Sequence, residues 1–298
     1  YTMMILKPSR LLVGLLLVGP ILMGQPVDAQ PSWQASAATV VTPLALFTNV
    51  QMASLPTTQT LSRGDFFYEI SHRFHPTLDE GYDANFGLDG PVSMRTALSY
   101  GLTDRWMLSI GRSNLLDNLD VITKWRFYER DGNLPLALAV TAGIAFNTDM
   151  PAIVDRGAGD ADNIQLMAQV VANTQVLDGR LGLGLVPSYV HNSAIFAVDR
   201  QHTITLGTYA HFELNPMWGL FVEYAPTLEG YQGILLPGES GRSHDSLSLG
   251  ATLSTGGHDF YLFATNNTRL NAAQYLVGAP TDAAPDNWHL AFGITRHL

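Results

Sequence analysis

Charged and histidine side chains recur on alternate positions of several extended segments of this sequence. They are Glu69, Arg73, Arg95, Arg105, Lys124, Arg126, His211, Glu213 and Glu223. Side chains two positions apart on a strand point to the same face, so we expect this set to line one common surface. Around a water-filled passage, the basic members would favour small polar or anionic solutes. In a filled interior, Glu69 and Glu223 would instead pair with the arginines and hold the surrounding strands together.

Serine and histidine stand next to each other at Ser71-His72 and at Ser243-His244. Hydrolysis by such a pair requires the nucleophile to hydrogen-bond with the base. Adjacent residues of a strand point to opposite faces, which keeps the two side chains apart. We therefore expect no enzyme, and a hydrolase built from more distant residues remains an alternative.

An acidic loop at 155–162 is a candidate metal site. Its carboxylates, Asp155, Asp160 and Asp162, are oxygen ligands of the kind that calcium prefers, but their spacing is not that of an EF-hand. The nine histidines show no repeated ligand spacing, and the sequence has no cysteine. The lack of cysteine excludes disulfides, thiolate chemistry and zinc–cysteine centres. We expect a solvated acidic loop and no metal or other cofactor.

The charged positions lie on segments whose larger, mostly apolar residues occupy every second position. In one of them, Val92, Met94 and Leu98 alternate with Ser93 and Arg95. This is the pattern of a strand with one apolar and one polar face. Twelve such segments are predicted, at 65–75, 91–100, 105–113, 118–130, 134–147, 163–176, 180–191, 201–213, 217–227, 245–254, 258–266 and 287–298.

The connections between these segments are of two alternating kinds. Short turns occur at 101–104, 131–133, 177–179, 215–216 and 256–257, and longer links at 76–90, 114–117, 148–162, 192–200, 228–244 and 267–286. Such sorting is typical of barrels of the bacterial outer membrane, and a sheet in hydrocarbon must close on itself to pair its backbone. The sequence thus predicts an all-β fold: a transmembrane, antiparallel up-and-down β-barrel of about 12 strands, with roughly 10–14 possible. Short turns would face the periplasm and long loops the outside.

The overall composition agrees with a barrel embedded in a membrane. Of the 298 residues, 46% are hydrophobic and only 14% are charged, whereas a soluble domain has roughly 25% charged residues. The net charge of -10 argues against a nucleic acid as partner. The expected partners are outer-membrane lipids, lipopolysaccharide and, during biogenesis, the barrel-assembly machinery.

Three parts are predicted along the chain. Residues 1–29 have a basic start and an apolar run at 11–23 that is too short for a spanning helix, so they are predicted to be a signal peptide. An N-terminal membrane anchor is the alternative. Residues 30–63 form either a periplasmic segment or one inserted into the barrel lumen. Residues 64–298 form the barrel, which is exported to the bacterial outer membrane.

The stretches GDFFYEISHRF, FGLDG, YGLTDRWMLSIGRS and AGIAFNT, together with Arg95 and Lys124, resemble a bacterial family of exported β-barrel proteins catalogued as a domain of unknown function. The resemblance runs from about Phe47 to the C-terminus. It implies the fold and the location but no activity. From the charged face we expect a narrow passive channel for small polar or anionic solutes. A non-conducting scaffold barrel in a cell-envelope assembly is one alternative, and an outer-membrane hydrolase is another.

Overall fold

The computed structural model of this protein describes residues 44–150, 155–197, 199–233 and 241–298. These residues lie in one compact unit. The predicted signal peptide, 1–29, and residues 30–43 of the following segment lie outside the described part. No helix within the described ranges combines the length and the apolar character that a membrane-crossing helix requires.

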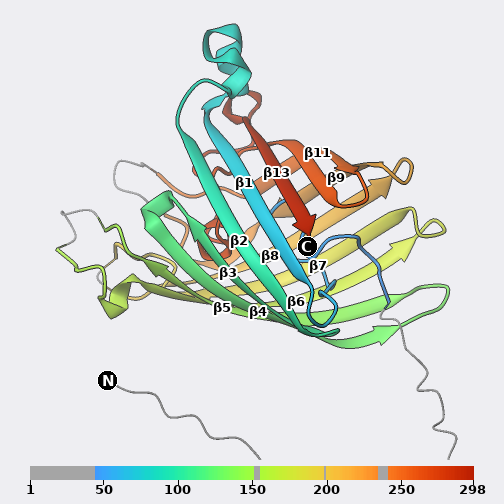
Figure 1. The fold of residues 1–298 in the computed structure, drawn as a ribbon. Helices are drawn as coiled ribbons and strands as arrows, with labels where there is room; N and C mark the ends of the chain where they lie inside the picture. Colours follow the sequence, from blue (N-terminus) through green and yellow to red (C-terminus); the bar gives the residue numbers. More distant parts are fainter. Residues whose placement is uncertain (1–43, 151–154, 198, 234–240) are drawn as a thin grey trace, which may run out of the picture. The chain divides into compact units, whose positions relative to one another are not determined.

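Antiparallel strands form one closed sheet (Figure 1). They are β1 (Phe66–Thr77), β2 (Val92–Thr103), β3 (Trp106–Ser113), β4 (Asn118–Arg130), β5 (Leu136–Asn147), β6 (Ile164–Val176), β7 (Leu181–His191), β8 (His202–Glu213), β9 (Trp218–Ala225), β10 (Thr227–Gly230), β11 (Ser246–Ser254), β12 (His258–Thr265) and β13 (His289–His297). The order is β10-β8-β7-β6-β5-β4-β3-β2-β1-β13-β12-β11-β9, and β8 also pairs with β9, which closes the ring. β9 and β10 both pair with β8 and are separated only by Pro226, which has no N–H to donate. They are two parts of one strand, so the barrel has twelve strands, which confirms the predicted fold class.

The connections sort by length as the sequence predicts. Short turns join β2 to β3, β4 to β5, β6 to β7, β8 to β9 and β11 to β12 at one end of the barrel, the short-turn end. The connections at the opposite, long-loop end carry the helices η1 (Leu78–Gly87), η2 (Leu115–Asp117), η4 (Ala161–Asn163), α1 (Ala272–Tyr275) and η5 (Pro285–Asn287). In the β6–β7 turn, Leu177 and Asp178 both have a φ of 54°. This geometry matches the twist of a hairpin and explains why so few residues suffice there.

The outer face of the barrel is apolar and exposed. Leu98, Ile110 and Leu262 have exposed fractions of 45%, 57% and 59%, and the residues that alternate with them are turned inward and are more buried. A continuous band of this kind would be a liability in water, but it is the surface that a spanning barrel presents to lipid. The alternation that defines the strands therefore also separates a lipid-facing wall from a polar lumen.

The lipid-facing band can be tested with one charge. Replacing Leu262, in the middle of β12, with arginine should lower the free energy of unfolding of the vesicle-embedded barrel by about 2–4 kcal/mol, because the charge would have to enter hydrocarbon. Denaturant titration in lipid vesicles measures the change. Tyr82→Arg, in η1 and 87% exposed, is the matched control and should leave stability unchanged. If Leu262→Arg also left the free energy of unfolding unchanged, this position of β12 would face water and not lipid.

Residues 44–63, called the plug below, lie mostly inside the barrel, with Ser62 and Arg63 exposed at its end; they begin the blue trace in Figure 1. Thr57 N donates to Val50 O at 3.0 Å and Met52 N donates to Leu55 O at 2.8 Å, which closes a hairpin. Leu55 is 0% exposed and packs in one apolar cluster with side chains of the wall. The plug thus contributes to the core of the barrel.

The loop between β12 and β13, residues 266–288, folds into the barrel from the long-loop end and is called the inward loop. Its Gln274 Nε2 donates to Asn147 Oδ1 on β5 at 3.3 Å, and its Leu276 O accepts from Thr205 Oγ1 on β8 at 2.6 Å. Tyr275 and Leu276 belong to the same apolar cluster as Leu55 of the plug. The lumen is therefore filled from both ends, and the two insertions share one core.

Candidate functional site

Two oppositely charged side chains of the wall hold the tip of the plug. Glu223 on β9 is 0% exposed, and its Oε1 accepts from the backbone N of Ser54 and of Leu55, each at 3.2 Å. Arg73 on β1 donates from Nη2 to Ala53 O at 3.0 Å and to Ser54 Oγ at 3.3 Å. Buried charges are tolerated only when they are paired or hydrogen-bonded, so the plug satisfies groups that the wall alone leaves unpaired.

Lys124 on β4 holds the two arms of the same hairpin. Its Nζ donates to Thr57 O at 2.9 Å, to Gln59 O at 3.0 Å and to Val50 O. The ammonium group has three donors, and all three are used on plug carbonyl groups. Lys124 therefore holds the hairpin through main-chain carbonyl groups, whatever side chains the hairpin carries.

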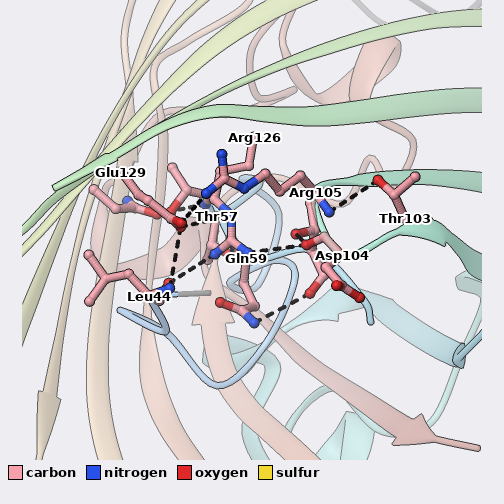
Figure 2. Close-up of polar contacts among 11 residues, drawn as sticks. Leu44, Thr57, Gln59, Thr103, Asp104, Arg105, Arg126 and Glu129 are labelled. Carbon is pink, nitrogen blue, oxygen red and sulfur yellow. Dashed lines mark hydrogen bonds and ion pairs between the residues drawn. The ribbon is translucent and has the colours of Figure 1, made fainter. Parts of the chain in front are cut away.

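The plug enters at the short-turn end through a second polar cluster (Figure 2). Arg126 donates to Leu44 O at 2.9 Å and to Asp104 O at 3.2 Å. Glu129 accepts from Leu44 N at 3.3 Å and pairs with Arg105. The far end of the plug returns to the same rim, where Thr60 Oγ1 donates to Asp104 O at 2.8 Å. Both ends of the hairpin are thus anchored beside one turn.

A buried ion cluster joins β1, β2 and β4 across the intervening strand β3. Arg95 on β2 contacts Glu69 of β1 at 3.3 Å and Asp120 of β4 at 2.6 Å, with side-chain exposures of 7%, 9% and 1%. To reach Asp120, the guanidinium crosses Gly111 of β3, where a Cβ would lie only 2.2 Å from Arg95 Nη2. Glycine at this position is what allows the arginine to span β3. At this cluster the structure has the second of the two arrangements expected from the sequence, a filled interior in which Glu69 pairs with an arginine.

A cavity of about 70 Å³ remains between plug and wall. Glu69, Arg95 and Lys124 line one side, and Val50 and Ser54 of the plug line the other. This volume has room for a few water molecules. It is the small space left between the plug and the wall in the filled lumen.

The structure corrects part of the predicted lumen lining. Arg73, Arg95, Lys124, Arg126, Glu69 and Glu223 face the lumen and are buried. Arg105 and Glu213 are instead exposed at the short-turn end, because Arg105 lies in the turn between β2 and β3 and Glu213 is the last residue of β8. His211 faces inward near that end, partly buried, 3.0 Å from Thr252 Oγ1.

Three acidic residues of the barrel interior and its rim are not among the predicted lumen residues. Asp120 and Asp259 are buried on the inward positions of β4 and β12, with 1% and 5% exposure, and Glu129 pairs with Arg105 and Arg126. Asp120 has the same parity as Lys124, so the pattern that found the lysine could have found it. With these acids the described lumen is mixed in charge, not basic.

The remaining chemical candidates do not assemble into sites. Ser71 points inward and donates to Glu69 Oε1 at 2.7 Å, whereas His72 points outward and stacks on Phe292. In the acidic loop, Asp160 accepts from Asp162 N at 2.9 Å, and the carboxylate of Asp162 binds Arg200 at 2.8 Å. The hydrogen bond and charge of Arg200 lower the pKa of Asp162. Among the described residues no group of three or more potential ligands could hold a metal ion.

Both a family model and solved structures match this chain. No curated protein sequence matches this chain significantly. Among solved structures, the chain is similar to the NanC porin, with 9% identity, 77% of this chain and 97% of that chain covered, and a TM-score of 0.46. It is also similar to the COG4313 outer membrane channel from Pseudomonas putida F1, with 13% identity, coverages of 81% and 98%, and a TM-score of 0.48. A family model described as a membrane bound beta barrel domain matches residues 47–298, which confirms the resemblance noted in the sequence. The chain therefore belongs to this family of membrane-bound β-barrel domains, DUF5777.

Proposed function

We propose that this protein is an outer-membrane channel in its closed state, with two gates in series. One gate is the plug at the short-turn end, and the other is the inward loop at the long-loop end. The observation that carries this function is the polar attachment of the plug: Lys124, Arg73 and Glu223 are buried against its backbone. A permanent filling would be at least as stable with apolar side chains, because buried charges add little net stability. Charged groups on the wall are useful when the lumen is at times hydrated.

The solutes would be small and polar. Arg95 is neutralised by Glu69 and Asp120, so the anion preference inferred from a basic wall loses its main support. Lipids and lipopolysaccharide of the outer membrane would surround the apolar band. Passive transport of this kind involves no catalytic step and no cofactor.

Weakening each gate from its own side tests the channel. Leu55 in the plug and Leu276 in the inward loop are 0% and 1% exposed. Replacing either with alanine should destabilise the closed position of its gate by about 2–5 kcal/mol. Since 1.4 kcal/mol is a factor of ten, the open fraction of that gate should rise at least about 30-fold. Two gates in series multiply, so in planar bilayers the double variant should show stepwise openings far more often than either single variant.

A substitution on the lipid-facing side serves as the control for the two gate variants. Leu262→Ala, on the lipid-facing side, should leave conductance at the wild-type level. A shift in gel mobility between unboiled and boiled samples verifies that each variant is a folded barrel. A folded double variant that remains silent would exclude the channel. It would favour the scaffold barrel, for which the apolar cluster shared by plug and inward loop would be a permanent core.

A further inference from the structure

Most hydrogen bonds from wall side chains to the plug go to main-chain atoms of the plug; the exceptions are those of Tyr261 with Asn49 Nδ2 and of Arg73 with Ser54 Oγ. Side chains from six strands take part: Arg73 of β1, Lys124, Arg126 and Glu129 of β4, Asn173 and Gln175 of β6, Tyr209 of β8, Glu223 of β9 and Tyr261 of β12. Asn173 Oδ1 accepts from Thr58 N at 2.7 Å, and Gln175 Nε2 donates to Leu46 O at 2.7 Å. Most of these contacts are thus made with groups that every peptide carries, whatever its side chains.

The wall supplies both hydrogen-bond donors and acceptors to the plug backbone. Tyr209 OH donates to Pro56 O at 3.0 Å and Tyr261 OH donates to Gln51 O at 3.2 Å. Glu223, in contrast, accepts two backbone N–H groups at the hairpin tip. A peptide backbone alternates strong donors with strong acceptors, and each must be paired when buried. A phosphate or a carboxylate solute offers no donors to Glu223 and Asn173.

Two glycines of the wall leave room for side chains of the bound segment. A Cβ on Gly182 would lie 2.7 Å from the ring of Phe47, and a Cβ on Gly207 would lie 2.8 Å from Leu55. The Phe47 ring also makes an edge contact with Tyr209, with centroids 5.5 Å apart. These two pockets add apolar contacts to a site that otherwise binds mainly the peptide backbone by hydrogen bonds.

We propose that the barrel lumen is a peptide-binding site, occupied in the closed state by the plug as a tethered ligand. Free peptides of extended or hairpin form compete for the same side chains when the plug leaves. The inference rests on the proposed function in one respect, since the plug must be displaceable. Peptides then become the solute class of the opened channel.

The experiment converts the tethered ligand into a free one. A specific protease recognition sequence is inserted between Arg63 and Gly64, which are both exposed, and the chain is cut after folding. Isotope-labelled synthetic peptide with the sequence of residues 44–63 is added in excess, and mass spectrometry follows its exchange into the barrel. A second peptide carries alanine in place of Phe47 and Leu55, and maltohexaose serves as a polar competitor without peptide bonds.

The labelled peptide should exchange and bind saturably. The doubly substituted peptide should still bind, at least about 30-fold more weakly, and maltohexaose should not compete. Lys124→Met should weaken both peptides at least about 30-fold. Thr141→Val is the matched control: Thr141 Oγ1 donates to Gln169 Oε1 within the wall, so affinity should not change.

The outcomes separate this inference from the channel itself. A labelled peptide that fails to bind the cut, folded barrel overturns the peptide site, even if the Leu55→Ala, Leu276→Ala variant conducts. Complete loss of binding by the doubly substituted peptide also overturns it, because recognition would then depend on side chains. Saturable peptide binding to a barrel that never conducts would uphold the site and refute the channel.

Discussion

Replacing Lys124 with methionine should raise the fraction of molecules with a displaced plug at least about 30-fold. In the closed state the ammonium group donates to Thr57 O, Gln59 O and Val50 O. In the variant, Val50 O still accepts a hydrogen bond from Thr57 N. The carbonyl groups of Thr57 and Gln59 lose the hydrogen bond from Lys124 Nζ and stay inside the lumen. A buried group without its partner costs about 1–3 kcal/mol, so the closed state should lose about 2–6 kcal/mol relative to the open one. Methionine fills most of the lysine volume, so the change acts on the hydrogen bonds more than on packing.

A single reporter cysteine measures this displacement. The chain has no cysteine, and Thr58 in the plug is 2% exposed, so Thr58→Cys should react slowly with a water-soluble maleimide. When opening and closing are fast relative to the reaction, the labelling rate is proportional to the open fraction. Lys124→Met should accelerate labelling, and Thr141→Val should not. Ser62→Cys, at an exposed position, should react equally in all backgrounds. Equal rates at Thr58→Cys would show that Lys124 does not hold the plug.

The strands could be predicted because each faces two different surroundings. β5 was expected at 134–147 and is found at Leu136–Asn147, since lipid on one side and small lumen side chains on the other impose period two. The break at Pro226 was predicted as continuous strand over 217–227. There the missing N–H of proline prevents one ladder bond. The pairing with β8 resumes in the same register at Thr227, opposite Thr205, and shifts by one residue only between Thr227 and Glu229.

The two insertions into the lumen left little periodic signal. The plug is a hairpin whose groups pair with side chains more than one hundred residues away, such as Glu223, and α1 of the inward loop is four residues long. The charged faces were predictable from parity. Pairing of Glu69 with an arginine was one of the predicted alternatives, and Arg95 is that arginine. The contact of Arg95 with Asp120 was not predicted, because it requires both the register of β2, β3 and β4 and the space above Gly111.

Arg95→Met should lower the free energy of unfolding by about 3–5 kcal/mol, since it leaves Glu69 and Asp120 buried without their common partner. Their side chains are 9% and 1% exposed, so water cannot replace the guanidinium cheaply. Arg105→Met is the matched control. Arg105 also pairs with a carboxylate, that of Glu129, but its side chain is 48% exposed, and such surface pairs contribute about 0–1 kcal/mol. Denaturant titration of the two folded variants in lipid vesicles compares them directly.

A triple variant distinguishes charge pairing from packing. If the loss comes from unpaired carboxylates, adding Glu69→Gln and Asp120→Asn to Arg95→Met should recover most of the stability, because neutral groups of the same shape cost far less to bury. If the loss comes from the volume and reach of the arginine across Gly111, the triple variant should be no more stable than Arg95→Met alone. Recovery would mean that the cluster is a neutralised ion network that holds β1, β2 and β4 together. In that case Arg95 would have a structural role only. Gating should then depend on Lys124 and Arg73, the basic residues that bind the plug directly.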